Sequence, residues 1–228
     1  MFFVGLDDTD TLESRGTGRL ARQIAAALAT DYAVLGVTRH QLLVDPRVPC
    51  TRNNSSAAII LNANGNLDLT MLLARVRELM LEDYQPGSDP GLCVAGEVPA
   101  AITEFGRCTQ NQLVTQDEAR MLAAAHGIPL VGLGSDEDGV IGALAAVGLV
   151  ASGEDGRYVL VGCSRELSGL QPVSALLEAG IFAVRTPDGQ PVTSGLVQTD
   201  KLRPARRGGR PIAVVEWRGD HWWPLKLD

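Results

Sequence analysis

Three carboxylates lie within four positions, directly after a short apolar segment. Residues 2–4 (FFV) are typical of a buried strand, and Asp7, Asp8 and Asp10 follow where that strand should end. Carboxylate oxygens bind Mg²⁺, which usually also holds substrate phosphates. Like charges this close repel one another, and a bound cation would relieve the repulsion. We therefore predict a metal site at Asp7, Asp8 and Asp10, with turn and helix-capping roles as the alternative.

A glycine-flanked threonine, Gly16-Thr17-Gly18, precedes an apolar segment at 20–28 with helical spacing. A turn that enters a helix in this way exposes backbone N–H groups and the positive end of the helix dipole to an anion. Gly16, Thr17 and Gly18 therefore predict a phosphate half-site a few residues from the acidic one. The pattern G-x-x-x-x-G-K-[ST] is absent from the sequence, which excludes a Walker nucleotide site.

A polar loop, Thr51-Arg52-Asn53-Asn54, is the second chemical candidate. A hydroxyl, a guanidinium and two amides suit a phosphate or a ribose, because arginine donates paired, charge-assisted hydrogen bonds. A solvent-exposed turn explains the same residues equally well. Arg39 lies on a predicted strand that could neighbour the acidic one, where it would be a charge partner for the aspartates.

Three further segments favour structural interpretations. The acidic turn at 134–139 lacks the spacing of an EF-hand, so we expect a hydrated turn rather than a second cation site. The only basic cluster, Lys201 with 203–210 (RPARRGGR), is flanked by proline and glycine and predicts a mobile, solvated loop, with contact to a nucleic-acid backbone as the alternative. Tryptophans at 217, 222 and 223 predict a docked tail that fills core volume, with stacking on bases as the alternative.

Composition bounds the class of protein. A chain of 228 residues can form one large domain or two small ones, and its net charge of −7 argues against general nucleic-acid binding. None of the cysteines forms a C-x-x-C pair, which argues against a zinc ribbon and a disulfide framework. No apolar run reaches the ~20 residues that span a bilayer, and Met1 leads directly into a strand, so we expect no signal peptide, no membrane contact and a cytoplasmic protein.

The order of predicted elements indicates an α+β fold. Residues 1–97 follow the order β-α-β-β-α-β of a ferredoxin-like split β-α-β unit, with two helices on one face of an antiparallel sheet. Residues 98–228 predict a second α+β domain in a looser order. The predicted strands are 2–4, 32–44, 57–62, 91–95, 128–133, 158–161, 181–185 and 212–217, and the predicted helices 20–28, 67–82, 99–110, 115–125, 140–149 and 173–179. A capping box of Thr115 and Glu118 opens one helix, and the small residues at 140–149 (VIGALAAVGL) predict a helix in close contact with a neighbour.

Four motifs in a fixed order carry a family resemblance. GLDDTD at 5–10, Gly16-Thr17, P-x-TR-x-N at 49–54 and GVIGALAAVG at 139–148 resemble the N-terminal part of the archaeal isoleucine-tRNA agmatinylcytidine synthetases, which place agmatine on the anticodon wobble cytidine. The set covers about the first 165 residues, with weaker similarity beyond. Either the acidic motif or the GALAA block alone would be less specific.

The resemblance implies a kinase domain with an adjoining ferredoxin-like domain, and ATP and Mg²⁺ as cofactors. In that family the kinase domain phosphorylates the cytosine before the amine displaces the phosphate. By position, Asp7, Asp8 and Asp10 would hold Mg²⁺ and ATP phosphates, and Thr17 matches the family's phosphorylated threonine. Gly5 falls within the first motif, while Thr51, Arg52 and Asn54 fall on the family's Thr-Arg-x-Asn loop near the nucleotide.

Two departures from the family shape the functional prediction. The family's Cys-Thr-Thr is Gly16-Thr17-Gly18 here, and without cysteine pairs we expect neither the OB-fold nor the zinc ribbon that follow in the family. We expect a Mg²⁺-dependent, ATP-using phosphoryl-transfer protein whose acceptor is an RNA cytidine. The alternatives are a small-metabolite kinase or ligase, favoured by the acidic charge, and a non-catalytic nucleic-acid-binding module that depends on arginines 206, 207 and 210.

Overall fold

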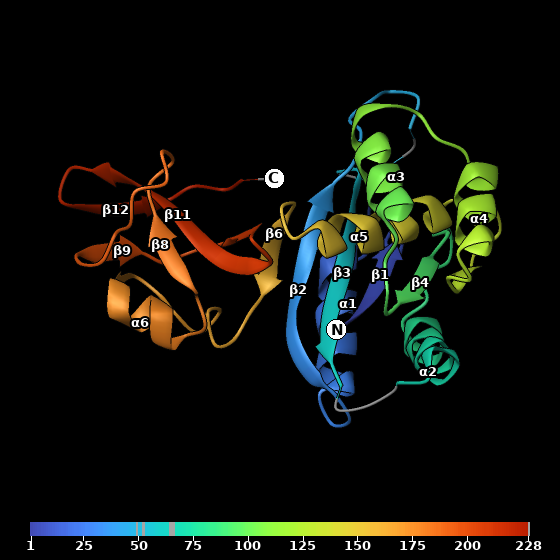
Figure 1. The fold of residues 1–228 in the computed structure, drawn as a ribbon, viewed down its shortest axis with the longest axis horizontal. Helices are drawn as coiled ribbons and strands as arrows, with labels where there is room; N and C mark the ends of the chain where they lie inside the picture. Colours follow the sequence, from blue (N-terminus) through green and yellow to red (C-terminus); the bar gives the residue numbers. More distant parts are fainter. Residues whose placement is uncertain (49, 52, 64–66, 228) are drawn as a thin grey trace.

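The computed structural model describes residues 1–48, 50–51, 53–63 and 67–227. They form an N-terminal lobe and a smaller C-terminal lobe of mostly β structure (Figure 1). The elements of the first are β1 Phe2–Asp7, α1 Thr17–Leu28, β2 Ala33–Gln41, β3 Ser55–Asn62, α2 Leu69–Glu82, β4 Gly91–Ala95, α3 Ala100–Asn111, α4 Gln116–Ala125, β5 Leu130–Gly132 and α5 Gly139–Ser152. Those that follow are β6 Arg157–Leu160, β7 Leu170–Pro172, α6 Val173–Glu178, β8 Ala183–Arg185, β9 Leu196–Gln198, β10 Ala205–Arg207, β11 Arg210–Arg218 and β12 His221–Pro224.

The sheet of the N-terminal lobe has the topology that the sequence predicts. Its strands lie in the order β5-β4-β1-β3-β2, and each is antiparallel to its neighbours. Val4 in the central strand β1 stands opposite Ile59 on one side and Val94 on the other. The first six elements thus have the order and pairing of a split β-α-β motif, and the α+β class is confirmed.

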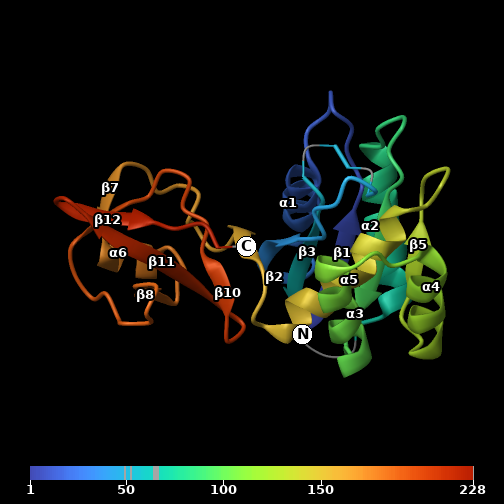
Figure 2. The ribbon, with the colours of Figure 1, turned by 90° about the horizontal axis from the view of Figure 1, so that it is seen from above.

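Helices cover both faces of this sheet. On one face, α1 and α2 bury Leu20, Ile24 and Leu72 against Val4 and Leu6 of β1. On the other, α5 crosses β1 so closely that a Cβ at Gly5 would lie 2.1 Å from the carbonyl oxygen of Ala143. The close packing predicted for this small-residue helix is therefore present (Figure 2).

The contacts of α5 with β1 and β4 join residues on the two sides of position 97, where the sequence suggested a boundary. A hydrophobic core continues from this face into the C-terminal lobe, because Phe3 and Leu144 belong to the same cluster as Val184 and Val215. The division into domains 1–97 and 98–228 stays a prediction.

The C-terminal lobe extends the same sheet from its β2 edge. Strand β6 pairs with β2 and with β10, and the order continues β10-β11-β12-β9-β7, with β8 parallel to β11. Strands β7, β9, β10 and β12 were not predicted. Each has only three or four residues.

The basic segment is not the mobile, solvated loop that the sequence predicts. Residues 205–207 form β10, and the side chain of Arg206 is buried, with 4% of the residue exposed. Its Nε donates to the carbonyl of Val150 at 3.0 Å, and its Nη1 donates to the Tyr158 hydroxyl at 2.6 Å and the Gly209 carbonyl at 2.7 Å. The last turn of α5 leaves carbonyls that need donors, and this arginine supplies one.

Only one of the three tryptophans fills core volume as expected. Trp222 packs against the core and meets Trp217 edge-on at 5.1 Å between ring centroids. Trp217 is 53% exposed and Trp223 36% exposed, and Arg218 lies over the Trp223 ring. Within the described part of the chain, no helix combines the length and apolarity needed to cross a membrane.

Candidate functional site

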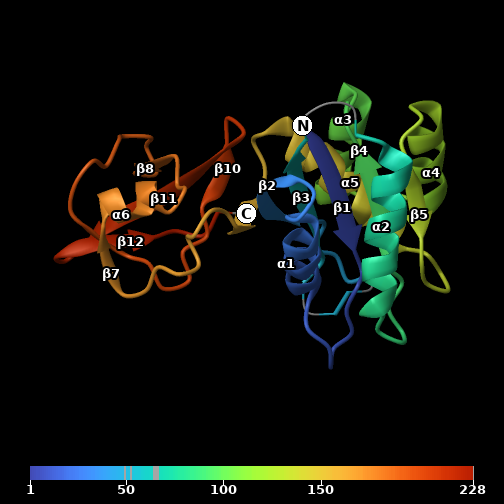
Figure 3. The same ribbon diagram turned by 90° about the horizontal axis from the view of Figure 1, so that it is seen from below.

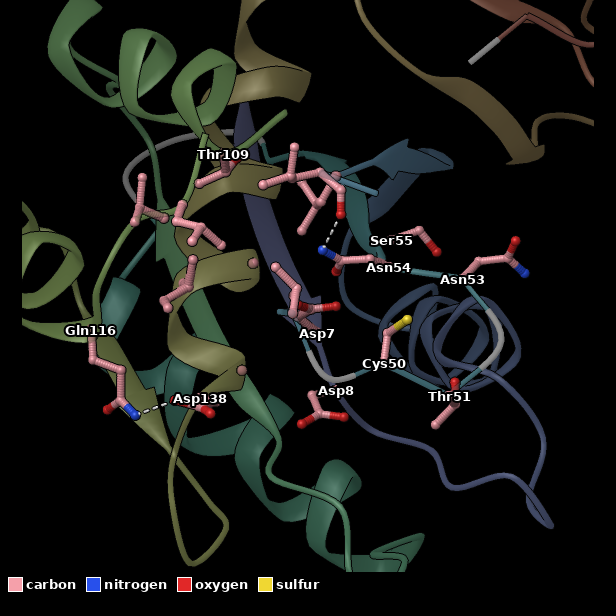
Figure 4. A pocket seen from close by; sticks show the side chains of 18 of the residues that line it. Asp7, Asp8, Cys50, Thr51, Asn53, Asn54, Ser55, Thr109, Gln116 and Asp138 are labelled. Carbon is pink, nitrogen blue, oxygen red and sulfur yellow. Dashed lines mark hydrogen bonds between the residues drawn. The ribbon is translucent and has the colours of Figure 1, made fainter. Parts of the chain in front are cut away.

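The acidic end of β1 opens into a cavity of about 450 Å³. Its walls come from the starts of α1 and α5, from residues 42–43, 47–48, 50–51 and 53–55, and from the segment between α3 and α4 (Figure 4). Asp7, Asp8 and Asp138 form an acidic floor, and Leu42 and Ile141 belong to a more apolar wall. The cavity therefore combines negative charge with a surface for a partly apolar group.

Two carboxylates of the predicted metal site carry perturbed pKa values. Burial raises the pKa of Asp7 to about 7, and the neighbouring charge of Asp8 adds to the effect. Burial likewise raises the pKa of Asp8 to about 6, with smaller contributions from the charges of Asp89 and Asp10. Within the described residues, neither side chain has an ion-pair partner. A bound cation would supply the missing positive charge.

The backbone directs these carboxylates into the cavity. Asp8 has φ of 49°, a left-handed conformation that aspartate and asparagine adopt more readily than other side chains. Asp7 lies against the first turn of α5, where a Cβ at Gly142 would come within 1.8 Å of its Oδ2. A glycine is therefore required opposite this carboxylate.

Two further aspartates approach Asp8 that the sequence did not assign to this site. Asp138, expected in a hydrated acidic turn, lines the cavity just before α5 and accepts a hydrogen bond from Gln116 at 2.5 Å. Asp89 precedes β4, and burial raises its pKa, but the N–H of Asp136 and the hydroxyl of Ser135 outweigh burial, so that the net pKa is lowered. The β1–β4 and β4–β5 pairings bring these segments together, and no local sequence pattern contains that information.

Asp10 differs from the other two predicted metal ligands because both of its carboxylate oxygens accept hydrogen bonds from the protein. Its Oδ1 accepts from the N–H of Thr17 at 3.2 Å and from the Thr17 hydroxyl at 2.9 Å, while its Oδ2 accepts from the Thr51 hydroxyl at 3.0 Å. It thereby caps α1, whose N-cap Gly16 has no side chain to do so. No group of three or more His, Cys, Asp or Glu side chains among the described residues is arranged to hold a metal ion.

A second cavity, of about 270 Å³, adjoins the first, and Asp10, Thr17 and Thr51 line both. It brings Gly16, Thr17 and Gly18 together with Arg39 and Thr51, so the predicted phosphate half-site and the predicted charge partner share one space. Arg39 donates to the Ser55 hydroxyl at 3.0 Å and to Gln41 Oε1 at 2.9 Å. The ion pair predicted between Arg39 and the aspartates stays a prediction.

The remaining predicted residues have three outcomes. Arg52 lies outside the described residues. Asn54 lines the first cavity and donates to the carbonyl of Leu43 at 2.9 Å, which holds the start of β3 against the segment that follows β2. Gly5 lies beneath α5, where close packing alone requires a glycine, and it lines neither of the two cavities.

Similarity to known proteins covers the N-terminal region. The similar proteins are tRNA-modifying enzymes, and one of their crystal structures contains ATP. No family model matches the chain. The chain is 26% identical over 147 residues to TiaS, the isoleucine-tRNA 2-agmatinylcytidine synthetase, of Cenarchaeum symbiosum, covering 64% of this chain and 32% of the relative. It is 29% identical over 156 residues to TiaS of Pyrococcus horikoshii, covering 65% and 35%.

Solved structures give the same result. The complex of TiaS with its isoleucine tRNA and ATP superposes with a TM-score of 0.57 at 27% identity, covering 64% of this chain and 36% of that one. The complex of TiaS with the same tRNA, AMPCPP and agmatine superposes with a TM-score of 0.56 at 26% identity, with 64% and 36% covered. The resemblance predicted from the motifs is therefore confirmed for this region. The chain spans about a third of the length of these relatives.

Proposed function

We propose that this chain is a Mg²⁺-dependent, ATP-using phosphoryl-transfer protein. The observation that carries the proposal is the meeting of Asp7, Asp8 and Asp138 at the floor of one cavity, two of them with raised pKa values. Such crowding costs stability unless a cation neutralises it. The similarity to TiaS, which has been solved with ATP, supports a nucleotide as the ligand that accompanies the cation.

The donor set fits magnesium. Mg²⁺ usually takes one or two protein carboxylates and fills its other positions with water and phosphate oxygens, so it does not need a complete protein cage. Asp7 and Asp8 would hold the ion, with Asp138 beside them, and Asp10 would contribute from its position at α1. When bound, the ion would neutralise charge on the transferring phosphoryl group.

Residues around the second cavity would hold the phosphates. The first turn of α1 offers backbone N–H groups beside Gly16 and Gly18, and Thr51 and Arg39 face the same space. Arg52, and Asn54 from the neighbouring first cavity, would also hold the nucleotide, as the resemblance implies. Oriented N–H groups and guanidiniums act by stabilising charge as it develops on the phosphoryl oxygens.

Thr17 is suited to receive a phosphoryl group. Its hydroxyl donates to Asp10 Oδ1 at 2.9 Å, within the range in which a carboxylate can accept a proton during reaction. In our proposal Thr17 Oγ1 attacks the γ-phosphorus, the bond to the β–γ bridging oxygen breaks, and the hydroxyl proton passes to Asp10. The hydrogen bond from Thr17 also caps α1, so the same contact would serve structure and chemistry.

An RNA cytidine is the acceptor that we propose, because the relatives are named for a modified cytidine in an isoleucine tRNA. A small-metabolite kinase or ligase is the second candidate. Leu42, Leu43, Val48 and Leu113 give the first cavity a wall that suits a small, partly apolar acceptor.

The test is release or transfer of the γ-phosphate of ATP. Asp8→Asn should abolish Mg²⁺-dependent turnover while circular dichroism shows an intact fold, because asparagine tolerates the left-handed backbone of Asp8. Asp83→Asn, on the exposed end of α2, is the matched control and should leave turnover unchanged. Equal turnover in Asp8→Asn and the control would contradict the proposal.

A further inference from the structure

Arginines from several separate segments gather beside the first turns of α1. Arg39 of β2 stands opposite Arg157 of β6, Arg22 lies on α1, Arg165 follows β6 and Arg203 precedes β10. Val37 and Val159 pack in the core beneath α1, so strand alternation places Arg39 and Arg157 on the face that α1 covers. We call this group the arginine strip; its members are Arg22, Arg39, Arg157, Arg165 and Arg203.

Three members of the strip lack the carboxylates that neutralise other arginines. Arg22, Arg165 and Arg203 each donate to a backbone carbonyl, that of Gly18 at 2.7 Å, Val159 at 3.1 Å and Leu202 at 2.7 Å respectively. None of these three has an ion pair within the described residues. In contrast, Arg47, Arg75, Arg107, Arg120 and Arg218 each pair with an Asp or Glu.

The strip is a concentrated positive charge in a partly buried place. Burial lowers the pKa of Arg22, and the charges of Arg165 and Arg203 lower it further. Burial also lowers the pKa of Arg203, followed by the charges of Arg165 and Arg157. An anion bound among these side chains would remove this repulsion.

The strip is continuous with the second cavity. Arg39 and Gly18 line that cavity, and Arg22 binds the carbonyl of Gly18 one helical turn further along α1. From there the strip leads past β6 toward the junction with the C-terminal lobe, which lies beside α1 and β2 in Figure 3. Arg39 is the one member that lines the second cavity, so a ligand that contacted every member would extend beyond that cavity.

We propose that the arginine strip binds successive phosphates of an RNA backbone and leads the strand into the second cavity. Guanidinium groups match phosphate oxygens with two parallel hydrogen bonds, and an arginine with one carbonyl contact, such as Arg22, Arg165 or Arg203, has five N–H donors from which to make them. The assignment of this RNA as acceptor rests on the proposed function, whereas its binding does not. The net charge of −7 limits binding elsewhere on the surface and leaves the strip as the local attraction.

Fluorescence anisotropy with a labelled, cytidine-containing RNA of about 15 nucleotides, a length near the upper site size of single-strand binders, tests the proposal. Arg22→Gln, Arg165→Gln and Arg203→Gln are measured singly and combined, with Arg75→Gln on the exposed face of α2 as the matched control. We expect the triple variant to lose at least about 30-fold in affinity and its salt slope to fall by about 2, since each phosphate contact on a single strand contributes about 0.7. The control should bind like wild type.

Three results would overturn the proposal. The first is that the wild type does not bind RNA, and the second is that the triple variant and the control bind RNA with equal affinity. The third is that the triple variant loses binding of ATP or inorganic tripolyphosphate while its RNA affinity is unchanged. The last would assign the strip to a free nucleotide. If the triple variant does not fold, the exposed Arg165→Gln alone decides, by its affinity and salt slope. Asp8→Asn separates the two proposals, because it should lose ATP turnover and keep RNA affinity.

Discussion

The acidic cavity and the arginine strip both lie near the start of α1 and carry opposite charge. Among the described residues, Asp7 and Asp8 have no cationic partner, and Arg22, Arg165 and Arg203 have no anionic one. Between them Asp10 is engaged by Thr17 and Thr51. The fold thus keeps the two charges apart instead of pairing them. This separation leaves each region to be neutralised by a ligand, a cation on one side and phosphates on the other.

Arg206 differs from the arginines of the strip because its side chain is buried and bound by oxygens of the protein itself. It lies three residues after Arg203, yet it is buried and makes three hydrogen bonds to oxygens of Val150, Tyr158 and Gly209. We expect Arg206→Leu to lower the free energy of unfolding by about 4 kcal/mol, because buried acceptors lose their donor. Arg203→Gln should change it by less than about 0.5 kcal/mol, as for most surface substitutions. Urea denaturation of both variants measures the difference, and equal effects would remove the distinction between the two arginines.

We expect the buried charge of the acidic cavity to lower the stability of the metal-free protein. Asp7→Asn removes the charge that burial opposes, so we expect it to raise the free energy of unfolding of the metal-free protein at pH 7 by about 2 kcal/mol. Urea denaturation at pH 7 and at pH 4 provides the check, since the gain should vanish where Asp7 is protonated. A destabilising Asp7→Asn at pH 7 would show that the carboxylate is satisfied by the protein alone.

The pH dependence of the wild type follows from the same shifts. The folded-state pKa values of about 7 for Asp7 and about 6 for Asp8 exceed the ordinary value of 3.8, so the folded state binds protons that the unfolded state has released. The contribution of these groups to stability is therefore greatest near pH 4 and falls as the pH rises to about 7. Thermal melts across this range should show the decline, and Mg²⁺ with ATP should reverse it at pH 7. Unchanged melts with Mg²⁺ and ATP would argue against cation binding.

The hydrogen bond from Thr17 to Asp10, which lies between the two regions, should have a smaller effect on stability than Arg206 or Asp7. Thr17→Ala removes the hydroxyl that donates to Asp10, and we expect a loss of about 1 kcal/mol, as for other helix-capping contacts. ATP binding should persist, while phosphate incorporation at residue 17 should disappear in mass spectra. Thr30→Ala, whose exposed hydroxyl binds the last turn of α1, is the matched control. Equal phosphate incorporation in Thr17→Ala and wild type would reject the role of Thr17.

The sequence predicted the parts of the site that are local and missed those that depend on distant pairing. The strand, the three aspartates and the Gly-Thr-Gly turn lie close together in the sequence, so their residue types and spacing were enough to predict them as one site. Asp89 and Asp138 reach Asp8 only through pairing of β4 with its neighbours, and the strip forms only when α1, β2 and β6 meet. Arg206 was misassigned because its acceptors lie on α5 and β6, and a basic cluster between Pro and Gly gives no sign of them.

Calorimetric titration of ATP with and without Mg²⁺, on wild type and Asp8→Asn, tests the assignment of the acidic cavity most directly. We predict that wild type binds ATP in a Mg²⁺-dependent manner and that Asp8→Asn loses this dependence while keeping its fold. Absence of ATP binding by the wild type, or equal Mg²⁺-dependent binding by the variant, would contradict a metal–nucleotide site at the end of β1.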